Sequence, residues 1–153
     1  MASLADGDTE KRLAEAKASI GENYTPSEDE EYMSERQLDY FRVLLLDWKK
    51  SIHDAAGQTL QSLQDGPIRE PDLNDRASSE TDWGIELRTR DRQRKLISKI
   101  DSALRLIDAG EYGYCAVTGD PIGLKRLIAR PVATMTVEAQ EAHERREKIS
   151  RDD

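Results

Sequence analysis

The sequence has one cysteine, Cys115, among its 153 residues. A single thiol cannot form a disulfide within the chain, so a disulfide framework is excluded and a reducing compartment fits. No apolar run approaches the roughly 20 residues that a membrane-spanning helix needs. The N-terminus, which soon reaches Asp6, Asp8 and Glu10, lacks the basic and apolar regions of a secretory signal. We therefore expect a cytoplasmic protein without a membrane segment.

Apolar residues and positive charge are also in short supply. Hydrophobic residues make up 37% of the chain and charged residues 35%, whereas a typical globular domain is only about 25% charged. This balance favours an elongated helical protein whose helices stay largely hydrated. The net charge of −8 argues against non-specific binding to nucleic acid, because neutralising phosphates requires an excess of Lys and Arg.

The sequence also lacks a phosphate-binding loop, a nucleophile triad and a metal-ligand motif. Because no catalytic constellation is present, we do not expect an enzyme. An independent hydrolase is the least favoured interpretation.

A first long helix is indicated after Ser34. Residues Ser34 to Gln37 form a capping box, in which the serine oxygen accepts an early backbone N–H and the glutamine side chain reaches back. The apolar residues that follow are spaced by alternating steps of three and four, which is typical of a coiled-coil seam: Leu38, Phe41, Leu45, Trp48, Ile52 and Ala55. Beyond Ile52 the seam is also compatible with a stutter through Ala56, Leu60 and Leu63. We expect the helix to end near Gln64.

A second long helix is indicated after Pro71. Its apolar positions are Trp83, Leu87, Ile97, Ile100, Leu104 and Ile107. The same frame places Arg90 and Arg94 on the seam, where their aliphatic stems can cover apolar surface while the guanidinium groups reach water. Gly110 suits the first position beyond the helix end.

These signals predict a mainly α fold. Two helices of about 30–35 residues, each about 45–50 Å long, are joined by a short turn-rich link and must run antiparallel. A compact bundle would need further long helices, which the sequence does not offer, so we expect a projecting coiled-coil hairpin. The expected units are an N-terminal segment (1–33), the hairpin (34–108, tip near 66–77), a small globular part (109–135) and a C-terminal helix (136–153). Leu4, Leu13 and Ile20 suggest one short helix in the N-terminal segment, followed by an extended link.

Four separate motifs, spread in order over residues 30–150, resemble the DksA/TraR family. They are Glu31-Tyr32-Met33, the stretch Asp72 to Ala77, the stretch Glu86 to Ile97 and the stretch Gly113 to Pro131. The resemblance implies a bacterial factor that inserts its coiled coil into the secondary channel of RNA polymerase. Such factors modulate ribosomal RNA and amino-acid promoters together with the alarmone ppGpp, and they do not bind DNA sequence-specifically. We expect a monomer that contacts the largest polymerase subunit.

The family's finger usually holds zinc with two pairs of cysteines, and this chain departs from that pattern. The four corresponding positions are Cys115, Thr118, Thr136 and Ala139. A closed structural zinc site needs about four nitrogen or sulfur ligands. We therefore expect a degenerate, zinc-less finger and no cofactor, and Thr136 is free to cap the last helix.

The resemblance also implies roles at the hairpin tip, for Asp72, Asp75 and Ala77. The two carboxylates would reach the catalytic centre of the polymerase and perturb it, without catalysing a reaction themselves. The alternative is that both aspartates only cap the second helix and offset its dipole.

Four cations, Arg88, Arg92, Lys95 and Lys99, fall on one face of the second helix. The resemblance assigns Arg88 and Arg92 to polymerase binding, and it assigns ppGpp to a site of four residues: Leu96, Lys99, Arg130 and Gln140. The family usually has a lysine where this chain has Gln140, so one cation is missing from that site. The alternative is an ordinary solvated face.

Two other functions remain open. A GreA-like transcript-cleavage factor would enter the same channel with the same fold. A coiled-coil adaptor unrelated to polymerase would need only the hairpin.

Overall fold

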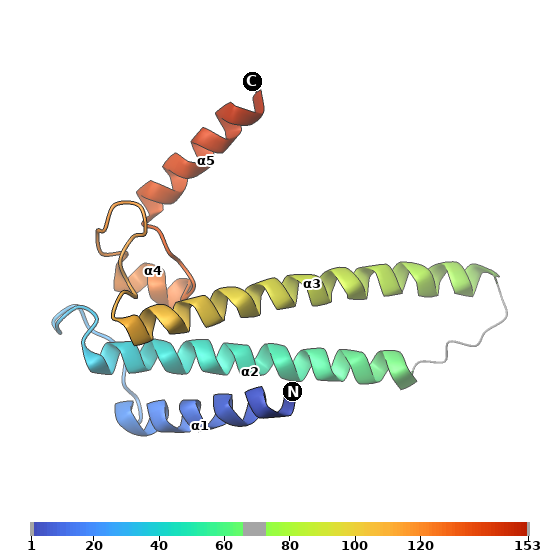
Figure 1. The fold of residues 1–153 in the computed structure, drawn as a ribbon, viewed down its shortest axis with the longest axis horizontal. Helices are drawn as coiled ribbons and strands as arrows, with labels where there is room; N and C mark the ends of the chain where they lie inside the picture. The colour runs from blue at the N-terminus through green and yellow to red at the C-terminus, as the bar shows by residue number, and fades with distance from the viewer. Residues whose placement is uncertain (1, 66–72, 153) are drawn as a thin grey trace.

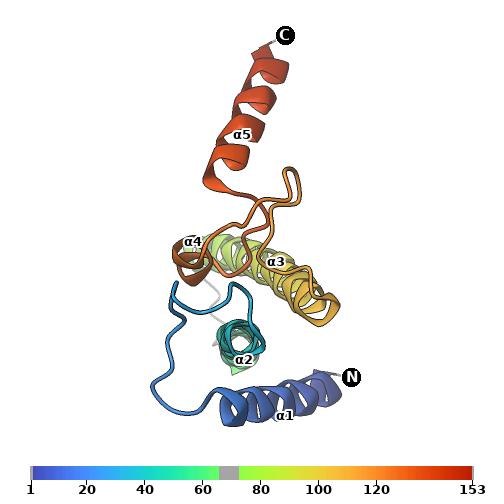
Figure 2. The same ribbon diagram turned by 90° about the vertical axis from the view of Figure 1, so that its left-hand side faces the viewer.

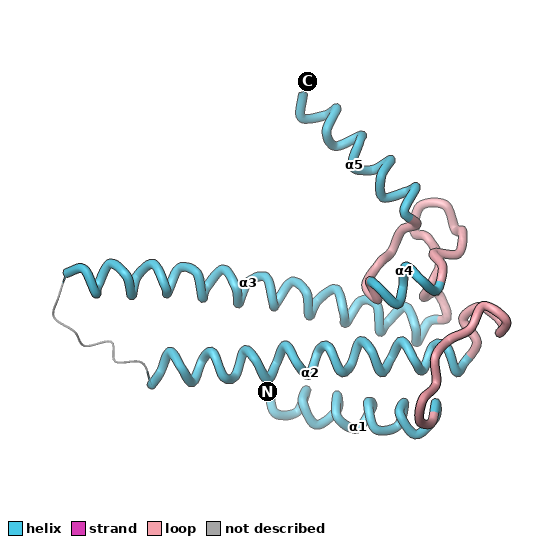
Figure 3. Tube along the Cα trace, turned by 180° about the vertical axis from the view of Figure 1, so that it is seen from behind, coloured by secondary structure: helices cyan, strands magenta, loops and turns pink. Residues whose placement is uncertain are grey.

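The computed structural model describes the backbone of residues 2–65 and 73–152, and the side chains of residues 7–57 and 80–150. Within these ranges the chain is mainly helical, as predicted: α1 (Ala2–Ile20), α2 (Glu35–Asp65), α3 (Leu73–Ala109), α4 (Leu124–Ala129) and α5 (Val137–Asp152). Loops gather at one end of the molecule (Figure 3). None of the helices described is long and apolar enough to span a membrane.

The two long helices lie side by side as an antiparallel hairpin (Figure 1). Arg42 of α2 pairs with Asp108 of α3 at 3.0 Å, and Lys49 pairs with Asp101 at 2.8 Å. The second pair is one heptad forward on α2 and one heptad back on α3, which fixes the antiparallel register. The helix α2 ends at Asp65, one residue beyond its predicted end.

The capping box at the start of α2 is confirmed. The Gln37 backbone N–H donates to Ser34 Oγ at 3.3 Å. The Gln37 side chain reaches one residue further back than a standard capping box requires and accepts the Met33 N–H at 2.8 Å. Its amide nitrogen donates to the Ser27 carbonyl at 3.1 Å. Gln37 is fully buried, so it ties the preceding linker firmly to the hairpin.

The C-terminal end of α3 is set by Gly110, as predicted. Gly110 has a φ of +74°, in the left-handed region. Its N–H donates to the Ile107 carbonyl at 3.1 Å, and the Glu111 N–H donates to the Leu106 carbonyl at 2.9 Å. These two bonds form a Schellman motif, which stops the helix and turns the chain into the small globular part.

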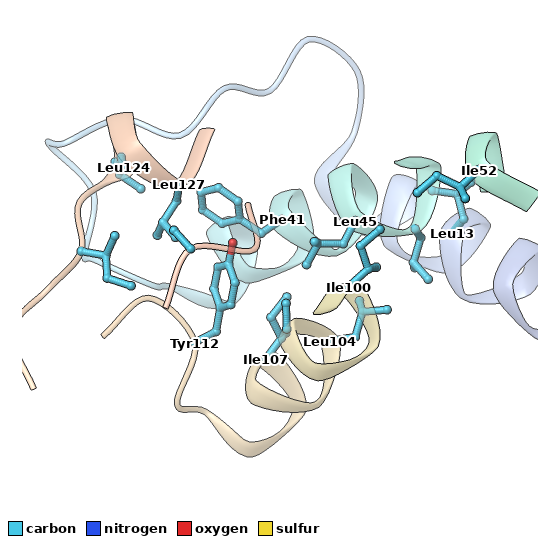
Figure 4. Close-up of a cluster of buried hydrophobic side chains, with 14 of the residues drawn as sticks. Leu13, Phe41, Leu45, Ile52, Ile100, Leu104, Ile107, Tyr112, Leu124 and Leu127 are labelled. Atoms are coloured by element: carbon cyan, nitrogen blue, oxygen red, sulfur yellow. The ribbon is translucent and has the colours of Figure 1, made fainter. Parts of the chain in front are cut away.

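The hydrophobic core lies at the base of the hairpin, where both long helices meet the small globular part (Figure 4). The predicted seam supplies its centre: Phe41, Leu45, Ile52, Ile100, Leu104 and Ile107 are all buried. Leu38, Trp48 and Ile97 are partly buried and pack against this cluster. Tyr112, Leu124 and Leu127 extend the cluster beyond the hairpin, so one core holds both parts together.

The predicted seam is wrong toward the tip. Trp83 is 38% exposed and Leu87 is 54% exposed. Burial stops because Arg90 and Arg94 interrupt the apolar positions of α3. On α2, Ala55 is exposed and Ala56 is half-buried, and methyl groups bury little apolar area. The predicted seam residues Leu60 and Leu63 lie outside the described side chains. The base of the hairpin is therefore tightly packed, whereas the part of α3 around Leu87 is open to solvent.

The N-terminal helix α1 is longer than expected and packs along α2 on the side away from α3 (Figure 2). Leu13, Ala16 and Ile20 are buried. Arg12 also reaches Asp108 of α3 at 3.4 Å. The sequence did not indicate this second packed face of α2.

Candidate functional site

Between α3 and α5 the chain forms a loop-rich unit around α4, here called the finger (residues 109–135). A single bridge pairs Tyr114 with Pro121. Inside the turn that it closes, the Cys115 N–H donates to the Asp120 carbonyl at 2.7 Å. The Ala116 N–H donates to the Thr134 carbonyl at 2.8 Å, which joins the turn to the segment leading into α5. Backbone hydrogen bonds therefore hold the finger's turn closed.

The thiol of Cys115 is buried in this turn. The Thr136 backbone N–H donates to its Sγ at 3.5 Å. Hydrogen bonds from the Thr118 side chain and from the backbone N–H groups of Thr136, Thr118 and Val117 lower the pKa of Cys115 from 9.0 to about 6, although burial opposes the shift. The sulfur therefore accepts hydrogen bonds as a thiolate would.

Thr136 caps α5, as predicted. The Ala139 backbone N–H donates to Thr136 Oγ1 at 3.1 Å, and the Gln140 N–H donates to the Thr136 carbonyl at 2.9 Å. The side-chain oxygen thus satisfies a backbone donor that the first helical turn cannot satisfy itself.

Two tyrosine hydroxyls join the finger to its surroundings. The Tyr32 hydroxyl, from the linker before α2, donates to the Gly113 carbonyl at 2.7 Å and accepts the Gly123 N–H at 3.0 Å. The Tyr112 hydroxyl donates to the Pro131 carbonyl at 2.7 Å. Burial raises the pKa of both tyrosines, so both hydroxyls keep their protons at neutral pH.

The predicted cationic face on α3 is exposed at Arg88, Arg92, Lys95 and Lys99. Lys95 pairs with Asp91 at 3.1 Å. The hydrogen bond from Lys95, and then that from Arg94, lower the pKa of the Asp91 carboxyl. Among the ion pairs of the side chains that the structure describes, none involves Arg88, Arg92 or Lys99. These three cations are therefore available to an external anion.

The four residues that the resemblance assigns to ppGpp come from three parts of the fold. Leu96 and Lys99 lie on α3, Arg130 directly follows α4, and Gln140 lies in α5. Leu96 packs against the core, while Lys99 and Arg130 are exposed. The side-chain amide of Gln140 donates to Glu144 of its own helix at 3.1 Å.

The core brings two of these parts together. Leu127 of α4 and Ile100 of α3 belong to one buried cluster, so the helices that carry Arg130 and Lys99 meet at the base of the hairpin. The helix α5 leads away from this base (Figure 1). No hydrogen bond or ion pair between described side chains joins Lys99, Arg130 and Gln140 directly.

The predicted tip residues fall outside what the structure describes in detail. Asp72 precedes the described part of α3, and Asp75 and Ala77 lie within α3 but outside the described side chains.

Comparison with known proteins identifies the family. The family model of the DnaK suppressor protein DksA, N-terminal domain, matches residues 37–107, and that of the prokaryotic dksA/traR C4-type zinc finger matches residues 110–145. The RNA polymerase-binding transcription factor DksA of Caulobacter vibrioides is 62% identical over 131 residues, which are 86% of this chain and 92% of that protein. The chain belongs to the DksA family.

More distant DksA proteins agree with this assignment. The RNA polymerase-binding transcription factor DksA of Escherichia coli K12 is 41% identical over 127 residues, covering 83% of this chain and 84% of that protein. The solved structure of transcription factor DksA2 from Pseudomonas aeruginosa is also 41% identical and superposes with a TM-score of 0.71, covering 81% of this chain and 94% of that one. These relatives are named as transcription factors. The DksA2 structure shares the fold of this chain.

The residues of this finger do not fit the zinc site for which the DksA finger is named. Of the four positions, only Cys115 supplies a thiolate, the Thr136 hydroxyl is already occupied in capping α5, and Ala139 has no donor atom. In the part of the chain that the structure describes, no group of three or more His, Cys, Asp or Glu side chains is placed to hold a metal ion. A closed structural zinc site requires about four nitrogen or sulfur ligands, and the four finger positions supply only one.

The interpretation of the sequence missed Tyr32 and Tyr112 as contacts of the finger. Tyr32 belongs to a motif that carried the resemblance and Tyr112 lies next to another, but a tyrosine hydroxyl that bonds a distant backbone group leaves no periodic signal. The glycines offered a partial clue. A side chain at Gly113 would lie 2.8 Å from Met33 Sδ, which shows how closely the linker approaches the finger.

Proposed function

We propose that this protein regulates transcription by binding RNA polymerase through the secondary channel and modulating promoter complexes together with ppGpp. The observation that carries the proposal is the 62% identity to a DksA named for polymerase binding. The affected promoters would include those of ribosomal RNA and of amino-acid biosynthesis. The protein would act as a cytoplasmic monomer that contacts the largest polymerase subunit, without catalysis and without sequence-specific DNA binding.

The shape of the hairpin supports entry into a narrow channel. The helix α2 has 31 residues and α3 has 37, so at the usual helical rise the hairpin is about 45–55 Å long. The finger broadens its base, and α1 runs along one side of α2 from the base to about the middle of that helix (Figure 1). The two-helix part beyond α1 could therefore insert until α1 and the finger stop it.

The proposed contacts follow the length of the rod. Asp72, Asp75 and Ala77 at the tip would act near the polymerase catalytic centre. Arg88 and Arg92 would bind the polymerase along the shaft, since both are exposed and neither is used in an ion pair of the described side chains.

At the base, the effector site would consist of Leu96, Lys99, Arg130 and Gln140. Lys99 and Arg130 would supply charge-assisted hydrogen bonds to the phosphates of ppGpp. Gln140 brings no charge, so this site would hold the alarmone with one cation fewer than a site with lysine there.

We further propose that the finger is stable without zinc. Cys115 contributes one ligand, whereas hydrogen bonds around its Sγ, the Thr136 cap and the two tyrosine hydroxyls supply the cross-links that a metal would otherwise provide.

The direct test of the proposed function is binding to purified core RNA polymerase. The wild-type protein should bind, and the double variant Arg88→Ala/Arg92→Ala should bind at least tenfold more weakly, because each lost charge-assisted bond costs about 1.5–3 kcal/mol. Arg105→Ala is the matched control, since Arg105 is an exposed cation of α3 that bonds Ser102 at the base. If the wild-type protein does not bind, the proposed function is wrong and the alternative of a coiled-coil adaptor unrelated to polymerase is favoured. Equal affinity of all three proteins would show that the shaft cations are a solvated face.

A further inference from the structure

The helix α4 is too short to hold its own orientation. It has six residues, and no side chain caps its N-terminal end at Gly123. A helix of this length forms few internal hydrogen bonds, and its stability must come from tertiary contacts. Two leucines, Leu124 and Leu127, anchor one side in the core. Apolar contacts are not directional, so these two leucines do not fix the direction of the α4 axis. Hydrogen bonds at the ends of the helix are needed for that.

A tyrosine hydroxyl fixes the start of α4. The Gly123 N–H, immediately before the helix, donates to the Tyr32 oxygen at 3.0 Å, and the same hydroxyl donates to the Gly113 carbonyl at 2.7 Å. Tyr32 is itself held in place because the next residue, Met33, donates its N–H to the buried Gln37 side chain at 2.8 Å. The start of α4 is therefore tied to the base of α2.

A second tyrosine hydroxyl fixes the chain just beyond the other end of α4. Tyr112 donates to the Pro131 carbonyl at 2.7 Å. Its side chain is 2% exposed, and its ring packs on Phe41 of α2 with ring centroids 5.3 Å apart. The hydroxyl cannot swing away, because the ring is enclosed in the core (Figure 4).

Arg130 stands between these two fixed points. It is the C-terminal cap residue of α4, and its N–H donates to the Arg126 carbonyl. Its side chain is exposed, so the position and direction of the guanidinium group depend on the backbone on either side of Arg130. Binding a phosphate through a guanidinium is geometrically demanding, and a pre-positioned group binds more tightly because less freedom is lost on binding.

We propose that Tyr32 and Tyr112 are positioning residues of the effector site: their hydroxyls hold both ends of α4 and thereby orient Arg130 toward the phosphates of ppGpp. This inference rests on the proposed function, because it takes Arg130 to be a phosphate contact. The two tyrosines do not touch the alarmone themselves. They control its affinity through the position of Arg130. Loosening either end lowers the affinity for ppGpp without changing the hairpin that enters the polymerase.

The test uses the full-length protein with the variants Tyr32→Phe and Tyr112→Phe, which keep the ring and remove only the hydroxyl. Tyr24→Phe is the matched control, since the Tyr24 hydroxyl bonds Glu30 within the linker at 2.8 Å and does not reach α4. Lys99→Ala serves as the variant that removes a direct contact. Promoter inhibition is titrated with ppGpp at fixed protein concentration, and inhibition without ppGpp is measured alongside.

The midpoint of the ppGpp titration should rise about three- to tenfold for Tyr32→Phe and for Tyr112→Phe, the range that loss of one neutral hydrogen bond gives. Inhibition without ppGpp should stay within about twofold of the wild type, as expected when a binding contact is affected rather than the hairpin. Tyr24→Phe should match the wild type in both. Unchanged midpoints in both tyrosine variants would overturn the inference. A parallel loss of ppGpp-free inhibition would also overturn it, because it would show a general structural role.

Hydrogen exchange separates failure of this inference from failure of the proposed function. In Tyr32→Phe and Tyr112→Phe, amides of residues 124–131 should exchange faster, while those of α2 and α3 should keep wild-type rates. Unchanged exchange in this segment would overturn the positioning role directly, whatever the transcription assay shows. If exchange rises as expected but the wild type shows no response to ppGpp, the proposed effector site is wrong and the tyrosines have no regulatory role.

Discussion

Thr136 Oγ1 accepts the Ala139 backbone N–H at 3.1 Å, so two positions that the family resemblance assigns to zinc ligands form a helix cap here. The three-residue spacing between positions 136 and 139 serves a helix cap as well as it would serve a metal site. A pair of ligands three residues apart suits a metal at a helix start, and the same separation lets an N-cap oxygen reach the third helical N–H. At this spacing, a hydrogen bond can therefore join two positions that a metal would otherwise join.

The first prediction concerns this cap. Thr136→Ala should lower the free energy of unfolding by about 0.5–2 kcal/mol, the usual cost of losing an N-cap. Thr134→Ala is the matched control, because the Thr134 side chain is exposed and its backbone carbonyl bond is kept. Chemical denaturation monitored by helicity measures both. Equal stability of the two variants would mean that the cap contributes nothing.

The second prediction concerns zinc itself. The purified wild-type protein should contain no stoichiometric zinc, and a chelator should leave its melting temperature unchanged. The triple variant Thr118→Cys/Thr136→Cys/Ala139→Cys should bind zinc in a one-to-one ratio, since it restores four thiolates. Elemental analysis decides between the alternatives. One zinc per wild-type chain, removed together with helicity, would contradict the proposed zinc-free finger.

The third prediction separates the buried seam from its exposed extension. Leu45→Ala should cost about 2–5 kcal/mol of unfolding free energy, because Leu45 is fully buried and the change leaves a cavity. Leu87→Ala removes the same atoms from a side chain that is 54% exposed and should cost less than about 1 kcal/mol. Denaturant melts of the two variants measure this difference. Similar losses of unfolding free energy in both would contradict the prediction.

The base of the hairpin was predictable because its apolar residues repeat with one period. Phe41, Leu45, Ile100 and Leu104 lie where the heptad frame places them. The same frame failed at Trp83, which is exposed, because periodicity tells which residues share a face but not whether that face is buried in the folded protein. The packing of α1 was not predictable either, since few of its residues are large and apolar and ion pairs such as Arg12–Asp108 help to fix it.

The finger was predictable only in part. Ligand counting and capping preferences are local, and they indicated the role of Thr136. The contacts of Tyr32 with Gly113 and Gly123 join segments far apart in sequence. No spacing rule connects such positions, so these contacts emerge only in three dimensions.

The fourth prediction is a pH dependence centred on Cys115. Its pKa is lowered from 9.0 to about 6, so the folded state favours the thiolate more than the unfolded chain does. The stabilisation is therefore complete above the unfolded pKa and is lost as pH falls through the folded pKa. The unfolding free energy of the wild type relative to Cys115→Ala should increase as pH rises from about 6 to about 9. A difference that is constant across this range would show that the thiol is neutral in the folded protein.

In vitro transcription from a ribosomal RNA promoter with purified RNA polymerase tests the proposed function most directly. Four reactions compare no addition, protein alone, ppGpp alone, and both together. The protein should reduce promoter output, and the combination should reduce it by more than the product of the separate effects, because the proposed effector site would join the alarmone to the protein bound in the secondary channel. Stimulated cleavage of backtracked transcripts in place of inhibition would favour the GreA-like alternative. If the protein leaves promoter output unchanged, both with and without ppGpp, the proposed function is wrong.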